Sequence, residues 1–268
     1  MIQHPDTPCL LQFECSKPNE ILFFTTTRLG GISKPPFDTF NLGNYSDDDP
    51  NDISENRRRL AKTLGIEPHR LIVPKQVHGD RIATIDKHFF SLPPFKQTLH
   101  INDCDALITN QKEVCIGVTT ADCLPVLLYD PIQQVIAAIH AGWRSTVLKI
   151  VKKTIDTMSG TFNTSASDLI AAIGPAIGQQ AFEVGEEVMT AFNEAGLLYK
   201  TAFYRHPETG KGHINLSEVN RLQLIDCGVN SNNIETAELC THSNRHTFFS
   251  ARRDGIRSGR MVSGAVIR

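Results

Sequence analysis

Short apolar runs rich in β-branched residues recur along the first two thirds of the chain, and they predict a series of β-strands. Runs of this length, bounded by Gly, Pro, Asn or Asp, are more typical of strands than of long helices. A Gly- and Pro-rich loop is expected over residues 28–43, and a second Pro-containing loop near residues 93 and 94. The expected strands are residues 21–27, two short segments within 70–86 interrupted at Pro74 and at His78–Gly79, and residues 105–109, 114–120, 124–130, 134–141 and 168–174.

Apolar residues at helical spacing predict the helices. Ser54 is expected to cap a helix over residues 54–66, with Ile53, Leu60 and Leu64 on its buried face. Two more helices are expected over residues 184–196 and 216–228, each ended by a glycine. After Ser145 the apolar period becomes helical, and one face collects Val147, Ile150, Val151, Ile155 and Met158.

The order of these elements favours a mixed α+β fold over a regular alternation of strands and helices. The 268 residues show no internal repeat, low-complexity tract or long linker, so we expect a single domain over residues 1–268. No GxGxxG or GxxxxGK[ST] motif is present, and the two commonest phosphate-binding loops of nucleotide-binding proteins are therefore not expected.

The charge balance excludes several classes of partner. With 27 basic and 29 acidic residues the formal net charge is -2, which argues against binding to nucleic acid or to an anionic membrane surface. Seven cysteines without a CxxC pair, no signal-peptide pattern and no apolar run that could span a bilayer favour a cytoplasmic protein. The expected partners are small molecules, and the expected oligomeric state is a monomer or a homodimer.

Three residues with metal-binding side chains end or interrupt apolar segments: His78, Cys123 and His140. Two imidazoles and a thiolate suit zinc, and three protein ligands with a fourth position left to water are typical of a catalytic site. Copper suits the same ligands. The gaps of 45 and 17 residues match no short zinc signature. Cys123 acting as a nucleophile, with either histidine as base and Asp122 orienting it, is an equally valid interpretation of these residues.

Longer motifs surround these positions. The stretches "QVHGD", "TTADCLPVLLYDP" and "AAIHAGWRST", with others in order between about residues 22 and 262, resemble the bacterial purine nucleoside phosphorylases formerly called multicopper polyphenol oxidases, or laccase-domain proteins. This resemblance implies layered β-sheets with surrounding helices and a zinc ion bound by His78, Cys123 and His140. It also implies phosphorolysis of adenosine, inosine and methylthioadenosine, accompanied by deamination of adenosine.

The implied chemistry suggests roles for further residues. Phosphorolysis needs cations for phosphate, and deamination needs a carboxylate to carry a proton. The cytidine-deaminase signature is absent. His242 and His246 depart from the family pattern and are candidates for extra metal contacts. The proposed assignments are phosphate binding by Arg28, Arg58 or Arg144, proton transfer by Asp122, and a purine and ribose pocket formed by Asn41, Phe248 and Phe249.

Three other functions compete with this hypothesis. A copper-dependent polyphenol oxidase is the older family description, but ten histidines without an HxH pair are a poor source of a trinuclear copper cluster. A hydrolase that edits peptidoglycan precursors would cleave an amide bond with water activated by zinc or with Cys123. A metal-binding protein without catalytic activity is the third alternative.

Overall fold

Two six-stranded mixed sheets face each other in the computed structural model, which describes residues 1–3, 9–17 and 19–268. The first sheet has the order β1 (Ile2–Gln3), β2 (Leu10–Gln12), β3 (Ile21–Thr26), β15 (Met261–Ile267), β7 (Cys115–Thr120) and β4 (Leu71–Ile72). The second has the order β14 (Ile234–Thr236), β10 (Ile170–Ile173), β8 (Leu124–Asp130), β9 (Val135–Ala141), β6 (Ala106–Thr109) and β5 (Ile82–Ile85).

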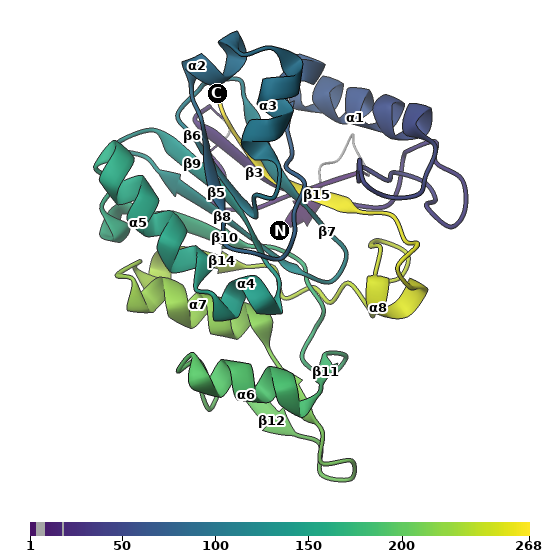
Figure 1. Cartoon of the computed structure of the whole chain (residues 1–268), viewed down its shortest axis with the longest axis vertical. Coiled ribbons are helices and arrows are strands. Elements are labelled where there is room, and N and C mark those ends of the chain that lie inside the picture. The colour runs from purple at the N-terminus through teal and green to yellow at the C-terminus, as the bar shows by residue number, and fades with distance from the viewer. Residues whose placement is uncertain (4–8, 18) are drawn as a thin grey trace.

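Helices flank these sheets, and a small third sheet forms a separate lobe beside α6 (Figure 1). The third sheet has the order β11 (Glu183–Val184), β13 (Gly212–Ile214) and β12 (Phe203–Arg205). The α-helices are α1 (Pro50–Leu64), α2 (Lys87–Ser91), α3 (Pro94–Ile101), α4 (Trp143–Val147), α5 (Ile150–Phe162), α6 (Glu186–Glu194), α7 (Leu216–Asp226) and α8 (Ala251–Asp254). Short 3-10 turns cover Pro68–Arg70, Ala166–Asp168 and Ser231–Asn233.

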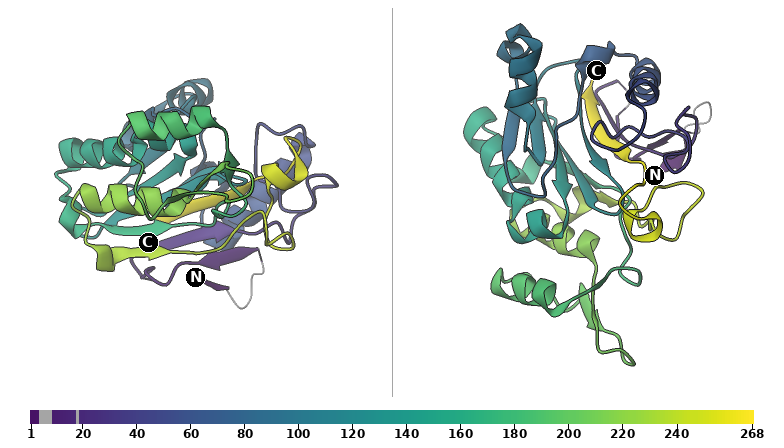
Figure 2. Two further views of the ribbon diagram at one scale, coloured as in Figure 1. Left: turned by 90° about the horizontal axis from the view of Figure 1, so that it is seen from below. Right: turned by 45° about the vertical axis from the view of Figure 1, so that its right-hand side comes forward.

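Three apolar cores hold the layers together. One lies between the two large sheets, where Phe23 and Ile116 of the first sheet meet Leu127 and Ala138 of the second. A second core lies between the second sheet and helices α5 and α7, and a third lies between the first sheet and α1. The ribbon views of Figure 2 show helices on the outer sides of the sheets. The layered α+β architecture expected from the sequence is therefore confirmed.

Most of the expected elements are present, with three corrections. Helix α1 begins at Pro50, and the Asp49 side chain, not that of Ser54, caps it by accepting from the Asn51 N–H. The loop expected near residues 93 and 94 is a short connection at Leu92 and Pro93 between two helices, α2 and α3, and Pro94 is the first residue of α3. The helix after Ser145 is divided into α4 and α5, because Lys149 adopts a left-handed backbone with φ 58°.

Two further findings concern membrane-spanning helices and disulfides. In the part of the chain that the structure describes, no helix is both long and apolar enough to cross a bilayer. All seven cysteines are free thiols.

Candidate metal centre

Strand alternation and two crossovers place the three candidate ligands. Ile136 and Ala138 of β9 face the first sheet, so His140, two residues further along, points to the same side. His78 lies in the turn that carries the chain from β4 in the first sheet to β5 in the second. Cys123 lies in the equivalent crossover from β7 to β8. The three side chains therefore meet at one end of the space between the sheets.

The ligand atoms of His78, Cys123 and His140 all lie within 4.8 Å of one another. The Cys123 Sγ is 3.7 Å from His78 Nε2, and the two imidazole rings are 4.9 Å apart between centroids. His140 is buried, Cys123 is partly buried and His78 is exposed, so the centre opens to solvent on the His78 side. A β-carbon at Gly142 would lie 3.1 Å from the Cys123 Sγ and 3.2 Å from the His78 ring. Glycine at this position keeps the space between the ligands free.

Asp105 supports two of the three ligands, and the sequence interpretation did not identify it. Its carboxylate is fully buried and accepts a 2.7 Å hydrogen bond from His140 Nδ1, which leaves Nε2 free to bind a metal. It also accepts from the backbone N–H groups of Val77, His78 and Gly79. These bonds hold the turn in which His78 takes a left-handed backbone with φ 62°. The sequence signal was the acidic residue directly before the apolar run 106–109.

The electrostatics of the centre favour a thiolate. Burial opposes ionisation of Cys123, but the His140 and His78 imidazoles outweigh it and lower the pKa of the thiol to about 6. Burial also opposes the charged form of His140, yet Cys123 and Asp105 together raise the pKa of His140 to about 9. A thiolate is the form of cysteine that binds metal ions or attacks an electrophile. Both interpretations of Cys123 therefore rest on the same electrostatic environment.

Asp122 anchors the segment before Cys123. It has a left-handed backbone with φ 92°, and its carboxylate accepts hydrogen bonds from Thr241 Oγ1, Ser250 Oγ and the Arg252 N–H at 2.6, 3.0 and 2.7 Å. These bonds tie the crossover before β8 to the segment around α8. The sequence prediction that Asp122 carries a proton stays a prediction, and the structure shows that both carboxylate oxygens already have protein partners.

The three arginines predicted to bind phosphate lie in different settings. Arg28 donates to the Asp38 carbonyl and carboxylate and to the Arg245 carbonyl, and its guanidinium lies over the Phe249 ring. Arg58 is exposed on α1 and pairs with Glu55. Arg144 is exposed, and its guanidinium carbon lies 4.2 Å from the centroid of the neighbouring Trp143 ring, over which it stacks. Of the three, Arg144 is the nearest to His140 along the chain.

The predicted pocket residues mainly support neighbouring loops. The Asn41 amide donates to Ser46 and Asp48 and accepts from the Gly43 and Arg260 N–H groups, so its hydrogen-bonding capacity is used within the protein. Phe248 and Phe249 are buried with Ala121 and Met261 in a small apolar cluster behind the crossover that carries Cys123. His242 and His246 do not belong to the group of potential ligands around Cys123.

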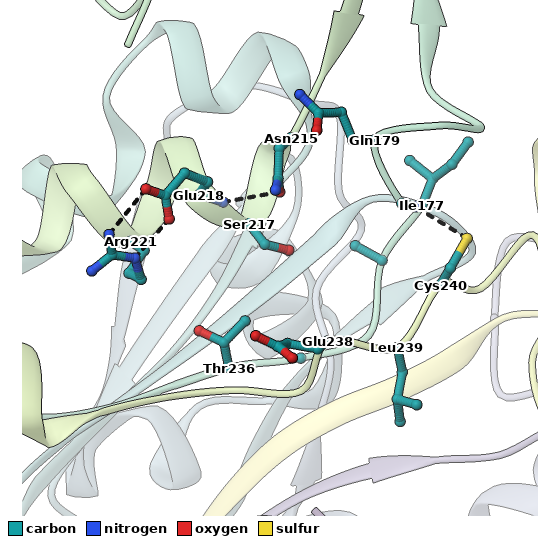
Figure 3. Close-up of a pocket in the computed structure, with 13 residues that line it drawn as sticks. Ile177, Gln179, Asn215, Ser217, Glu218, Arg221, Thr236, Glu238, Leu239 and Cys240 are labelled. Carbon is teal, nitrogen blue, oxygen red and sulfur yellow. Dashed lines mark hydrogen bonds and ion pairs between the residues drawn. The ribbon is translucent and has the colours of Figure 1, made fainter. Parts of the chain in front are cut away.

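A separate cavity of about 330 Å³ lies on the α7 side of the second sheet (Figure 3). Its lining includes Ser217 and the ion pair of Glu218 with Arg221 from α7, and Cys240 from the segment after β14. Burial opposes ionisation of Cys240, but hydrogen bonds from Ser243 and from the Gly178 N–H lower the pKa of its thiol. His140 points to the opposite side of this sheet, so the cavity is distinct from the metal centre.

The residues of the centre fit a single zinc or copper ion. Two imidazole nitrogens and one thiolate sulfur match the ligand preferences of both metals. Gly142 leaves room between the ligands, and Asp105 fixes His140 in the tautomer that presents Nε2. Across residues 1–3, 9–17 and 19–268, these three side chains are the one group of three or more potential ligands at such spacing.

Comparison with known sequences gives matches over nearly the whole chain. Residues 22–268 match the family model described as multi-copper polyphenol oxidoreductase laccase. A purine nucleoside phosphorylase of Bacteroides thetaiotaomicron is 42% identical over 249 residues, which are 93% of this chain and 92% of that protein. Adenosine deaminase RL5, from an unknown prokaryotic organism, is 39% identical over 241 residues, 90% of this chain and 92% of that protein.

Solved structures agree with the observed fold. The crystal structure of the hypothetical protein YfiH from Bacillus licheniformis superimposes with a TM-score of 0.90 at 30% identity, covering 99% of this chain and 98% of that one. YlmD from Geobacillus stearothermophilus gives a TM-score of 0.85 at 32% identity, with 94% of each chain covered. The two-sheet architecture is therefore shared with experimentally determined structures.

Proposed function

Because the chain belongs to the multi-copper polyphenol oxidoreductase laccase family, we propose that it is a zinc-dependent purine nucleoside phosphorylase with adenosine deaminase activity. Its substrates are adenosine, inosine and methylthioadenosine. The observation that carries the proposal is the open His78, Cys123 and His140 centre. It occurs in a chain that is 42% identical to a purine nucleoside phosphorylase and 39% identical to an adenosine deaminase.

His78, Cys123 and His140 hold the metal in this proposal. Zinc bound there supplies a Lewis acid and activates water. Asp105 holds the His140 ring and the His78 turn in place through buried hydrogen bonds, so the ligands keep their positions during turnover. Cys123 serves as a thiolate ligand in this mechanism and not as the nucleophile.

Other residues of the chain position the substrate. Trp143 and Arg144 lie at the start of α4, directly after Gly142, and in this proposal their aromatic ring and cation contact the nucleoside. Asp122 fixes the backbone that leads into Cys123. A nucleoside approaching from the His78 side meets the metal ligands and Arg144 together.

The test is an assay of purified protein loaded with a defined metal. Adenosine is supplied with and without inorganic phosphate, and adenine, ribose 1-phosphate and inosine are separated. Adenine and ribose 1-phosphate should form in equal amounts and require phosphate, whereas inosine should form in both conditions. Failure of zinc-loaded protein to release adenine or inosine would contradict the proposal.

The family description makes copper-dependent phenol oxidation the second candidate. Loading with copper and supplying a phenol under oxygen tests it in the same preparation. Phenol oxidation exceeding nucleoside turnover would favour this second function. A single three-ligand centre among the described residues favours nucleoside chemistry, because multicopper oxidation needs a cluster and a separate copper that accepts electrons.

A further inference from the structure

Arg260 lies beside the crossover that carries the metal ligand Cys123. It directly precedes β15, and the pairing of β15 with β7 places Met261 opposite Thr120. Arg260 therefore lies next to the end of β7, and from this end the chain continues through Ala121 and Asp122 to Cys123. The charges of Cys123 and Asp122 both act on its guanidinium.

The surrounding backbone fixes the Arg260 side chain. Its Nη1 donates to the Ser258 carbonyl, to Ser258 Oγ at 3.1 Å and to the Gly259 carbonyl at 3.0 Å. The Arg260 N–H donates to Asn41 Oδ1 at 2.9 Å, and a β-carbon at Gly43 would lie 2.9 Å from Arg260 Cγ. One side of the guanidinium is thus held by the protein. Its Nε has no acceptor among the described residues.

The Arg260 guanidinium forms no direct ion pair with a carboxylate among the described residues. Arg28 pairs with Asp38 and Arg58 pairs with Glu55, but no described carboxylate oxygen lies within 4.0 Å of the Arg260 guanidinium. Burial lowers the pKa of Arg260, although the charges of Cys123 and Asp122 partly oppose this effect. A partly buried cation without a carboxylate in direct contact is available to pair with an anionic ligand.

We propose that Arg260 binds the inorganic phosphate that attacks the nucleoside, an inference that rests on the proposed function. A phosphate oxygen forms a bond to C1′ of the ribose as the bond from C1′ to the purine nitrogen breaks. The purine leaves with the bonding electron pair and takes up the proton that hydrogen phosphate gives up. Arg260 holds the phosphate through the side of its guanidinium that carries Nε and Nη2, where Nε has no acceptor among the described residues and Nη2 has one long contact, to the Ile256 carbonyl at 3.5 Å. The planar geometry of this side suits two oxygens.

The two reactions of the enzyme separate this role from a structural one, because phosphorolysis consumes phosphate and deamination does not. In Arg260→Gln, the KM for phosphate should rise roughly 10- to 100-fold, the loss expected for charge-assisted hydrogen bonds. Phosphate-independent formation of inosine and the KM for adenosine should stay within about twofold of the wild-type values. Arg260→Lys keeps the positive charge without the planar guanidinium. Its KM for phosphate should lie between those of the wild type and Arg260→Gln.

Arg205→Gln is the matched control, because Arg205 is an exposed arginine of β12 that pairs with Glu186 in the separate lobe. Its phosphate KM should equal that of the wild type. An unchanged phosphate KM in Arg260→Gln would overturn the proposal. Equal losses of deamination and phosphorolysis in a folded, zinc-loaded variant would also overturn it, since they indicate a structural role.

Calorimetric titration of zinc-loaded protein with inorganic phosphate tests the binding step without turnover. Wild-type protein should bind phosphate, and Arg260→Gln should bind it at least tenfold more weakly. If that variant does not fold, Arg260→Lys should bind phosphate measurably more weakly than the wild type. Equal binding by wild type and variant rejects the role of Arg260. If wild-type protein binds phosphate through Arg260 but turns over no nucleoside, the proposed function fails and the phosphate site stands.

Discussion

Asp105 and Gly142 shape the metal centre without supplying a ligand atom. Asp105 accepts one hydrogen bond from the His140 ring and three from the backbone around His78, so a single carboxylate aligns two ligands. Gly142 leaves the space beside Cys123 and His78 open. At the scale of single residues, we expect the affinity of the centre for metal to depend on these supports as well as on the ligands.

Replacing Asp105 by Asn should weaken zinc binding about 10- to 100-fold, the usual cost of removing the carboxylate partner of a ligand histidine. Competition with a fluorescent chelator measures this affinity. Asp103→Asn is the control, because Asp103 is exposed two residues away and asparagine accepts its left-handed backbone with φ 57°. Equal zinc affinity in the two variants would show that Asp105 does not support the centre.

Cys123→Ser distinguishes a metal ligand from a nucleophile. Serine is a poor zinc ligand at neutral pH, so the variant should lose stoichiometric zinc together with both activities. Metal content by mass spectrometry and the adenosine assay are measured on the same sample. Full zinc content with lost activity would instead assign Cys123 the role of nucleophile.

Gly142→Ala should crowd the centre. The added methyl group would lie 3.1 Å from the Cys123 Sγ, and overpacking of this kind costs about 1–3 kcal/mol, or roughly 5- to 150-fold in zinc affinity. Gly160→Ala in α5 is the control, because a β-carbon there meets no atom within 4 Å. Unchanged zinc binding in Gly142→Ala would mean that the neighbouring ligands move aside freely.

At the scale of elements, α1 holds the long loop of residues 28–46 through one buried side chain. The Asn56 amide donates to Ser33 Oγ and to the carbonyls of Thr39 and Asn41, and it accepts from the Ile32 N–H. This loop in turn contacts Arg260 through Asn41. The connection runs from a helix on the outer surface to the crossover that carries Cys123.

Asn56→Ala should lower the free energy of unfolding by about 2–3 kcal/mol, because several buried backbone groups lose their partner. Urea unfolding followed by circular dichroism measures the change. Asn51→Ala, at an exposed position in the first turn of the same helix, should change the stability by less than about 0.5 kcal/mol. A similar value for both variants would show that the loop is held by other contacts.

The elements that the sequence predicts well are those whose local pattern reflects burial. Strand β9 and the apolar face of α5 are predicted from the spacing of their apolar residues. Both faces of β9 pack against a core, and the apolar face of α5 packs against one of these cores. Helix α2 was missed because its five residues are too few to show a helical period, although Phe89 is buried. Helix α3 was missed because it has no buried residue, and its Phe95 and Leu99 face solvent. The support of His140 by Asp105 joins residues 35 positions apart, and no local period encodes such a contact.

At the scale of the whole molecule, the metal centre joins the two large sheets. His78 and Cys123 lie on the two crossovers that lead from the first sheet to the second, and His140 ends β9 in the second sheet. A metal bound by all three residues therefore links three segments that are far apart in sequence. We expect metal binding to stabilise the packing of the two sheets as well as to serve catalysis.

Zinc at a hundredfold excess over its dissociation constant should stabilise the folded protein by about 2.7 kcal/mol, since the unfolded chain does not preform the site. For a protein of this size the melting temperature should rise by roughly 5–10 °C. Differential scanning calorimetry with zinc or with a chelator measures the shift. Cys123→Ser should abolish it, and an equal shift in that variant would place the stabilising zinc elsewhere.

Strand β15 is inserted between β3 and β7, although residues 21–26 precede it by more than half of the chain. During translation, β3 and β7 leave the ribosome long before the strand that joins them. The first sheet is therefore completed late, with edges exposed until residues 261–267 emerge, and Arg260 reaches its place in the same step. The three metal ligands are synthesised well before that point, so the nascent chain presents Cys123 to cellular metals and oxidants before its final surroundings exist.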